Sequence, residues 1–145
     1  MTAGDRTDPY LGFRFRVELD SLIVGAFAQV SGLSIEIDTE EVPEGGVNHY
    51  TRTVPTGTSH SNVTLERGLT DSSELWDWMQ ATVHGRVDRR NGRIILLDAA
   101  GDETWSWSFR GAYPVSWEGP DLDAAGSEVA IERLELAHLG FGGGP

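Results

Sequence analysis

The sequence contains no cysteine, so disulfide bonds, thiol nucleophiles and cysteine-ligated zinc sites are all excluded. Lysine is also absent, because all eleven basic residues are arginines, and this excludes a P-loop lysine and Schiff-base chemistry. No apolar run approaches the roughly 18 residues that a membrane-spanning helix needs. The first residues lack the basic and apolar segments of a signal peptide. We therefore expect no membrane insertion by this chain.

Positive charge is scarce as well, since the 145 residues carry a formal net charge of -12. Affinity for nucleic acid comes mainly from Lys and Arg on phosphate groups, so this balance argues against stable nucleic-acid binding. It favours solubility and repulsion of other polyanions. An acid excess without lysine fits a salt-rich habitat and a GC-rich genome equally well. The length indicates one domain spanning 1–145.

An alternating pattern runs from Phe13 to Leu19, where apolar and charged residues take turns without interruption. A period of two places the apolar side chains on one face of a strand and the charged side chains on the other. We therefore expect a half-buried antiparallel strand. Its polar face carries Arg14, Arg16 and Glu18.

Further segments of the chain have strand-like patterns separated by turn residues. An Asn91-Gly92 pair between two of them predicts a hairpin turn. Aromatic residues alternate with polar ones in another, and the chain continues after a kink. The segment from Glu128 to Leu139 fits strand alternation with a slip of register, but it also has good helix propensity. The remaining expected strands are Ile23–Val30, Leu33–Thr39, Asn62–Arg67, Val87–Arg90, Arg93–Leu97, Trp105–Phe109 and Ala112–Trp117.

One helix is expected, over about 71–84. Its apolar positions recur at helical spacing on a single face, with Thr70 or Asp71 as the N-cap and Gly85 as the stop. We interpret this face as core packing against the sheet rather than as a cofactor site. The residues of the face are Leu75, Trp78, Met79, Thr82 and Val83.

Residues 40–61 contain several Pro and Gly residues, few apolar residues and no clear period. A structureless connection of that length is unusual inside a compact domain. Two interpretations remain open: a mobile surface loop, or an arm that something outside the monomer orders. The arm could be a hairpin with Val47–Val54 as its return strand. We expect 1–8 and 140–145 to be flexible ends.

No active site is evident in the sequence. The four histidines lack metal-ligand spacing, and Gly57–Ser61 is not a nucleophile elbow. The paired acids Glu40-Glu41 and Asp102-Glu103 lie on predicted turns, where solvated charge is the usual explanation. We therefore predict no catalytic, metal-binding or cofactor-binding residues, and no cofactor.

Three elements near the N-terminus occur in a recognisable order. They are the aromatic-rich strand after Asp8-Pro9-Tyr10, the Gly25-x-Phe27-x-x-Val30-Ser31-Gly32-Leu33 element and the Glu44-Gly45-Gly46 turn. This order resembles the tail-tube protein family of contractile phage tails and extracellular contractile injection systems. The resemblance continues to the C-terminus and covers nearly the whole chain.

The resemblance implies a mainly β fold, an antiparallel β-sandwich or barrel with one packed helix, whose subunits form rings. Hexameric rings would stack into a hollow tube that sheath contraction drives through a target envelope. Glu128–Leu139 would be the closing strand, with a bulge. The candidate lumen face is Arg14, Arg16 and Glu18. The resemblance also implies that an arm docks on a neighbouring subunit, with the residues Glu40, Glu41, Val42, Pro43, Glu44, Gly45, Gly46, His49 and Tyr50.

The partners that the resemblance implies are other copies of this chain, a sheath protein, and baseplate and tube-terminating proteins. A protein effector or DNA would pass through the lumen. Assembly would take place in the cytoplasm of the producer, and the particle would be extracellular or a virion. The alternatives are the tail tube of a contractile phage, a type VI secretion tube protein, and a monomeric ligand-binding β-sandwich.

Overall fold

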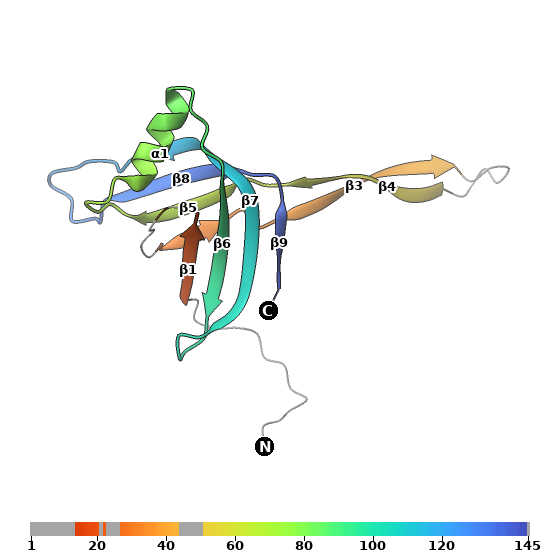
Figure 1. The fold of residues 1–145 in the computed structure, drawn as a ribbon, viewed down its shortest axis with the longest axis horizontal. Helices are drawn as coiled ribbons and strands as arrows, with labels where there is room; N and C mark the ends of the chain where they lie inside the picture. The colour runs from red at the N-terminus through yellow and green to blue at the C-terminus, as the bar shows by residue number, and fades with distance from the viewer. Residues whose placement is uncertain (1–13, 21, 23–26, 44–50, 145) are drawn as a thin grey trace, which may run out of the picture.

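A computed structural model describes residues 14–20, 22, 27–43 and 51–144. These residues form a mainly β structure with a single helix, as the sequence predicts (Figure 1). In chain order the elements are β1 (Arg14–Leu19), β2 (Gln29–Ser31), β3 (Ile35–Pro43), β4 (Thr51–His60), β5 (Val63–Gly68), α1 (Glu74–Val83), β6 (Arg90–Leu97), β7 (Glu103–Glu118), β8 (Ile131–Ala137) and β9 (Phe141–Gly144).

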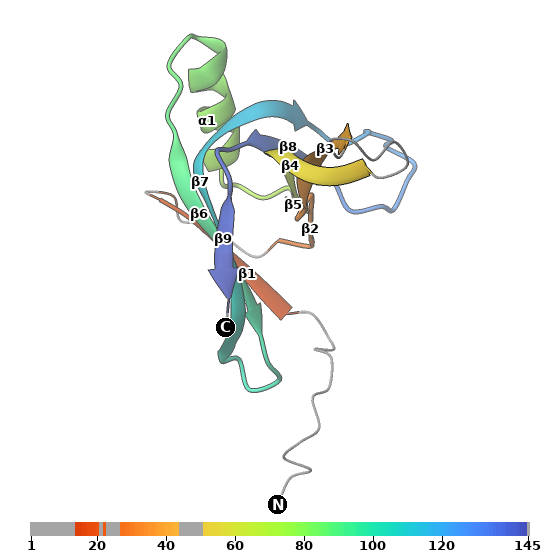
Figure 2. The same cartoon turned by 90° about the vertical axis from the view of Figure 1, so that its right-hand side faces the viewer.

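Seven strands form one antiparallel sheet in the order β1-β6-β7-β8-β5-β2, and β9 also pairs with β7. The sixteen-residue strand β7 belongs to both halves of this sheet, one formed with β1, β6 and β9 and the other with β8, β5 and β2. The first part of β7 pairs with β6 and β9, and the last part pairs with β8. Gly111 has a φ of 63°, and the register shifts between Pro114 and Ser116. The predicted kink lies here, and β7 arches from one half to the other (Figure 2).

The core lies inside this bend, where the inner faces of both halves meet α1. Strand β1 contributes Val17 and Leu19, both buried as the alternation predicts, and Phe15 packs partly buried against them. Phe13 lies outside the described residues. The buried core cluster consists of Val17, Leu19, Phe27, Val63, Leu65, Leu75, Trp78, Ile94, Phe109, Ala112, Leu134 and Leu136.

Helix α1 is shorter than predicted, since it spans Glu74–Val83 rather than 71–84. The predicted N-caps, Thr70 and Asp71, are wrong, because the N-cap is Ser73, whose hydroxyl donates to the Asp77 carboxylate 2.9 Å away. The Thr70 side chain stabilises the turn before the helix instead, where its hydroxyl oxygen accepts a hydrogen bond from the Ser72 N–H at 3.2 Å. The predicted stop is confirmed, since the helix ends at Val83 and Gly85 follows with a φ of 88°. Leu75 and Trp78 are buried as expected, whereas Val83 is exposed.

The predicted hairpin at Asn91-Gly92 is wrong, because both residues lie inside β6, where the register against β7 shifts between Arg90 and Gly92. A Cβ atom on Gly92 would lie 2.3 Å from the Phe109 ring and 2.9 Å from Leu19. The glycine therefore provides room for a core ring rather than a turn. The Asn91 side chain is also occupied, since its Oδ1 accepts the Gly111 N–H at 3.0 Å.

The segment from Glu128 to Leu139 contains β8, so the strand interpretation is confirmed. Its register is continuous along β5, and the irregularity opposite it lies in β7. Without a slip, the even-numbered side chains face inward from Glu132 to His138. Val129 and Ile131, which the slip would have buried, are exposed.

Part of the 40–61 segment is an ordered hairpin. Strands β3 and β4 form a separate two-stranded sheet that projects from the body (Figure 1). We call this sheet the arm. It begins at Ile35 rather than at Glu40, and its return strand begins at Thr51. The end expected to be flexible at 140–145 instead contains β9, which pairs with β7.

A charged pair lies within the core layer between β5 and β8. Arg67 Nε donates to Glu132 Oε1 at 3.3 Å, and the two side chains are only 4% and 3% exposed. The Arg67 guanidinium also lies 5.5 Å from the centre of the Phe27 ring. Each charge is tolerated because the other is present, since a single buried charge would lack compensation.

Replacing Arg67 alone should therefore strongly destabilise the fold. We expect Arg67→Met to lower the free energy of unfolding by about 3–5 kcal/mol, because Glu132 is left buried and unpaired. Adding Glu132→Leu should recover most of that loss. Arg133→Met, which breaks the exposed ion pairs of Arg133 with Glu66 and Glu118, should destabilise the fold far less. Urea unfolding followed by circular dichroism measures all three, and equal losses for Arg67→Met and Arg133→Met would contradict this account.

Candidate functional site

The described residues contain no group of three or more His, Cys, Asp or Glu side chains that could hold a metal ion. Within the same residues, no helix has the length and apolar character needed to cross a membrane. The features that stand out are surfaces: a charged sheet face, two open sheet edges, the arm and an acidic cavity.

The charged sheet face is the outer face of β1, β6 and β7, opposite the core. Arg16 Nε lies 3.3 Å from Glu18, and Arg93 lies 3.2 Å from Glu18 and 3.7 Å from Glu103. Arg16 also pairs with Glu103. The four side chains are 45–48% exposed. Together with Arg14 they carry three positive and two negative charges, so this face is not acidic although the chain is.

The predicted lumen residues Arg14, Arg16 and Glu18 do share this face, as their alternation requires. Their partners Arg93 and Glu103 come from strands that are distant along the chain, so no local pattern indicates them. No local pattern indicates either that Ile95 lies opposite Arg16 in the register. Directly opposed residues share a face, yet Ile95 is fully buried. The charged network therefore covers an aliphatic side chain on the outer surface.

Two edges of this half of the sheet are open. Strand β1 pairs with β6 and β9 pairs with β7, and no described strand covers their outer sides. Strand β9 is nearly all glycine, and Gly143 has a φ of 143°. A Cβ atom on Gly143 would lie 2.3 Å from the Ser106 carbonyl oxygen. Close pairing of β9 with β7 therefore requires glycine at position 143. The open outer edges of β1 and β9 are templates for pairing with a further strand.

The arm exposes both of its faces. In its register Ile35, Ile37 and Thr39 lie on one face, and Glu36, Asp38 and Glu40 lie on the other. Ile35 and Ile37 are 57% and 55% exposed. A two-stranded ribbon is at best marginally stable alone in water, so its apolar face needs a cover from outside the arm.

The predicted arm residues fall into two groups. Glu40, Glu41, Val42 and Pro43 lie in β3 and are exposed. The others lie outside the described residues, and they are Glu44, Gly45, Gly46, His49 and Tyr50.

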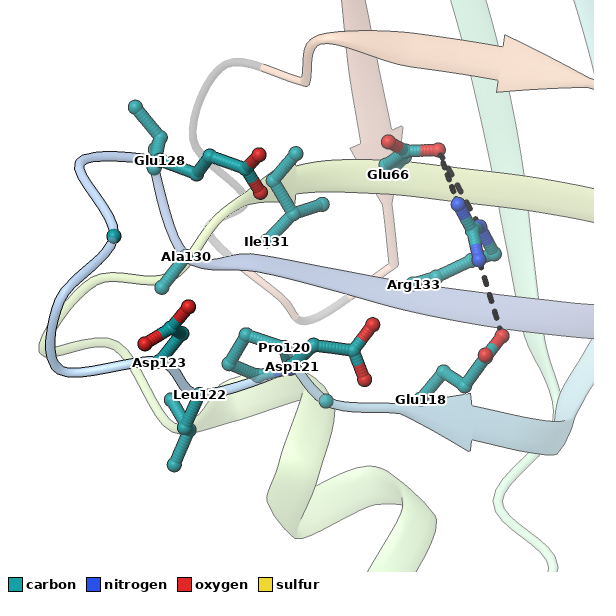
Figure 3. Close-up of a pocket in the computed structure, with 13 residues that line it drawn as sticks. Glu66, Glu118, Pro120, Asp121, Leu122, Asp123, Glu128, Ala130, Ile131 and Arg133 are labelled. Carbon is teal, nitrogen blue, oxygen red and sulfur yellow. Dashed lines mark hydrogen bonds and ion pairs between the residues drawn. The ribbon is translucent and has the colours of Figure 1, made fainter.

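An acidic cavity of about 370 Å³ lies beside the loop that connects β7 to β8 (Figure 3). Arg133 donates to Glu66 and to Glu118, each at 3.1 Å. These hydrogen bonds, the one to Glu118 first, raise the pKa of Arg133 above its ordinary value. Asp121 and Asp123 lie along the loop. The loop falls between the two segments predicted as strands, Ala112–Trp117 and Glu128–Leu139, but the pairing of Arg133 with both glutamates depends on neighbouring strands.

The sequence matches the family model of the T4-like virus tail tube protein gp19 over residues 11–142. The chain belongs to this tail tube family. The predicted family is therefore confirmed, and with it the role of a structural tube subunit. Among curated proteins, none matches the sequence.

Solved structures of contractile injection systems are similar over nearly the whole tail tube chain. A chain of the anti-feeding prophage (AFP) baseplate is 26% identical, with a TM-score of 0.82, and 95% of this chain and 97% of that chain are covered. A chain of the PVC sheath–tube complex in the extended state is 28% identical, with a TM-score of 0.83 and coverage of 93% and 90%. Hcp1 from Flavobacterium johnsoniae, at 15% identity, a TM-score of 0.55 and coverage of 89% and 93%, shares the fold.

The charged sheet face should contribute little to the stability of the tail tube subunit. Exposed ion pairs are worth about 0.2–1 kcal/mol and are weakened by salt. We expect Glu18→Gln to lower the free energy of unfolding by less than about 1 kcal/mol at about 20 mM salt, and by less still at about 500 mM. Urea unfolding at both salt concentrations checks this. A loss above about 2 kcal/mol, or one that grows with salt, would contradict it.

Proposed function

We propose that this chain is the inner-tube subunit of a contractile injection system, and that its copies form six-membered rings that stack into a hollow tube. The observation that carries the proposal is the unfinished β-structure of the single subunit. Strands β1 and β9 have open edges, and the arm has an exposed apolar face. Family membership supports the same role, and the similar AFP baseplate is six-fold symmetrised.

Ring closure would satisfy both edges at once. If β1 of one copy pairs with β9 of the next, the sheet continues from subunit to subunit with no free edge. Such an arrangement is a heterologous contact, which closes into a ring when the rotation between copies fits. Each copy contributes four strands, β1, β6, β7 and β9, so six copies give a barrel of 4 × 6 = 24 strands.

The outer face of these four strands would line the bore of the tube. Arg14, Arg16 and Glu18 would then face the cargo, as the sequence predicts. Mixed and mutually paired charges offer no single-sign field that would hold a charged cargo. A protein effector or DNA would therefore pass without being retained.

The subunit would act mechanically rather than catalytically. A sheath would surround the tube and drive it through a target envelope, and baseplate and terminating proteins would close its two ends. The similar chains come from an AFP baseplate, an AFP tube-terminating cap and a PVC sheath–tube complex. Assembly would take place in the producing cell's cytoplasm, before release of the particle.

A contractile phage tail tube is the second candidate, because the matching family model describes a T4-like virus tail tube protein. Both candidates use the same rings. A monomeric ligand-binding β-sandwich is the different-class alternative. It would have to leave the edges of β1 and β9 and the apolar face of the arm uncovered.

The arm provides a direct test of assembly. We expect the wild-type chain to form rings or tubes in negative-stain electron microscopy, and Ile35→Asp/Ile37→Asp to remain monomeric. The reason is that two charges would stand on the face that a neighbouring copy covers. Because both positions are exposed in the subunit, its thermal midpoint should hardly change. Ile35→Val/Ile37→Val keeps the face apolar and should assemble. A monomeric wild type would refute the proposed function, and assembly of the double Asp variant would refute the role of the arm.

A further inference from the structure

Two histidines from distant parts of the chain stack at the root of the arm. His60 is the last residue of β4, where the arm joins the body, and His138 follows β8 directly. Their ring centres are 4.1 Å apart and their planes differ by 21°. His60 is also paired with Ile35 in the arm register. The stack therefore connects the base of the arm to the segment that leads into β9.

The hydrogen bonds of His138 select its neutral form. The Gly140 N–H donates to His138 Nδ1 at 3.1 Å, so this nitrogen is an acceptor and carries no proton. The proton must then lie on Nε2, which donates to the Ser61 carbonyl oxygen at 2.8 Å. Both ring nitrogens are thus used by backbone groups, one from the arm root and one from the start of β9.

The surroundings oppose a positive charge on His138. The ring is 7% exposed and packs against the rings of Phe141 and Phe109, with centres 4.3 and 6.0 Å away. Burial is the largest cause that lowers the pKa of His138, the hydrogen bond to the Ser61 carbonyl oxygen partly offsets it, and the nearby His60 lowers the pKa further. His60 Nδ1 is itself buried, with no hydrogen-bond partner among the described residues.

The other charged groups near the stack do not compensate for such a charge. From β7, Arg110 donates to the Leu139 carbonyl oxygen at 3.3 Å, which adds a positive charge nearby. From β8, Glu135 accepts a hydrogen bond from Asn62 at 2.7 Å and is already occupied. Among the described residues, neither imidazole ring forms an ion pair with a carboxylate. Phe109, Phe141 and Ile35 are uncharged.

We propose that the His60–His138 stack is an acid-sensitive latch that fixes the arm and the edge strand β9 to the same point of the body. Protonation of His138 places a hydrogen on Nδ1, where it meets the Gly140 N–H and removes that hydrogen bond. It also places a cation against the stacked ring of His60. The arm root and the first residues of β9 then lose their shared anchor.

The direction of the pH dependence follows from proton binding. The pKa of His138 is lower in the folded chain than its ordinary value of 6.5, so the open or unfolded chain binds more protons below that value. Stability therefore rises with pH in this range. The latch is fully closed above about pH 6.5, and its contribution is lost progressively as the pH falls from there through the folded pKa.

Hydrogen exchange measured by mass spectrometry on the full chain tests the latch. Peptides that cover 51–61 and 138–144 should lose protection several-fold between about pH 7.5 and about pH 5.5, after correction for intrinsic rates. Peptides from β5 and β6 should keep theirs. His60→Phe retains a stacked ring but removes the second imidazole, so it should reduce the loss. His84→Gln, at the exposed end of α1, is the matched control and should respond as the wild type does.

A second measurement keeps the test decisive if His60→Phe folds poorly. In the wild type, NMR of the histidine ring carbons should show His138 titrating below its ordinary pKa of 6.5. A midpoint at or above that value would overturn the proposal, as would a protection loss spread evenly over the chain or an undiminished response in His60→Phe. The latch lies within one chain, so absence of rings at about pH 7.5 would refute the proposed function without affecting this proposal.

Discussion

Backbone hydrogen bonding at the edge of an antiparallel sheet is the constraint on which this structure depends. An edge strand presents a row of unpaired N–H and C=O groups on its outer side, which is a template for pairing with another strand. Within the described residues, β1 and β9 leave such edges at the two sides of one half-sheet. The arm adds an apolar face with no cover of its own. These features are the basis of the proposal that copies of the tail tube subunit complete one another's β-structure.

The long strand β7 makes this arrangement possible. Because it bends near Gly111, both halves of the sheet can pack with α1 around the core. The outer face of the half formed by β1, β6 and β7 carries the charged side chains. Interior packing explains residues that local patterns misplace. Gly92 is required by the Phe109 ring, and Glu132 is buried because Arg67 meets it. The same body holds the arm and β9 together at His138.

The sequence predicts those features that depend on near neighbours in the chain. Alternation locates β1 and helical spacing locates the buried face of α1. The lack of any apolar period in 40–61 leaves a mobile loop and an arm open, and the family resemblance favours the arm. Features set by distant residues escape such reasoning. Asn91-Gly92 has the composition of a turn, but Phe109 decides its structure. Arg16 pairs with Glu18 of the same strand and with Glu103 of β7, and only Glu18 is near it in the sequence.

Electron cryo-microscopy of the assembled protein, at a resolution that traces individual strands, tests the central claim most directly. The account predicts closed rings in which the outer edge of β1 in one copy is hydrogen-bonded to β9 of the next, with the arm lying on a neighbouring subunit. An assembled particle in which both edges remain exposed, or a chain that stays a single subunit at high concentration, would contradict it.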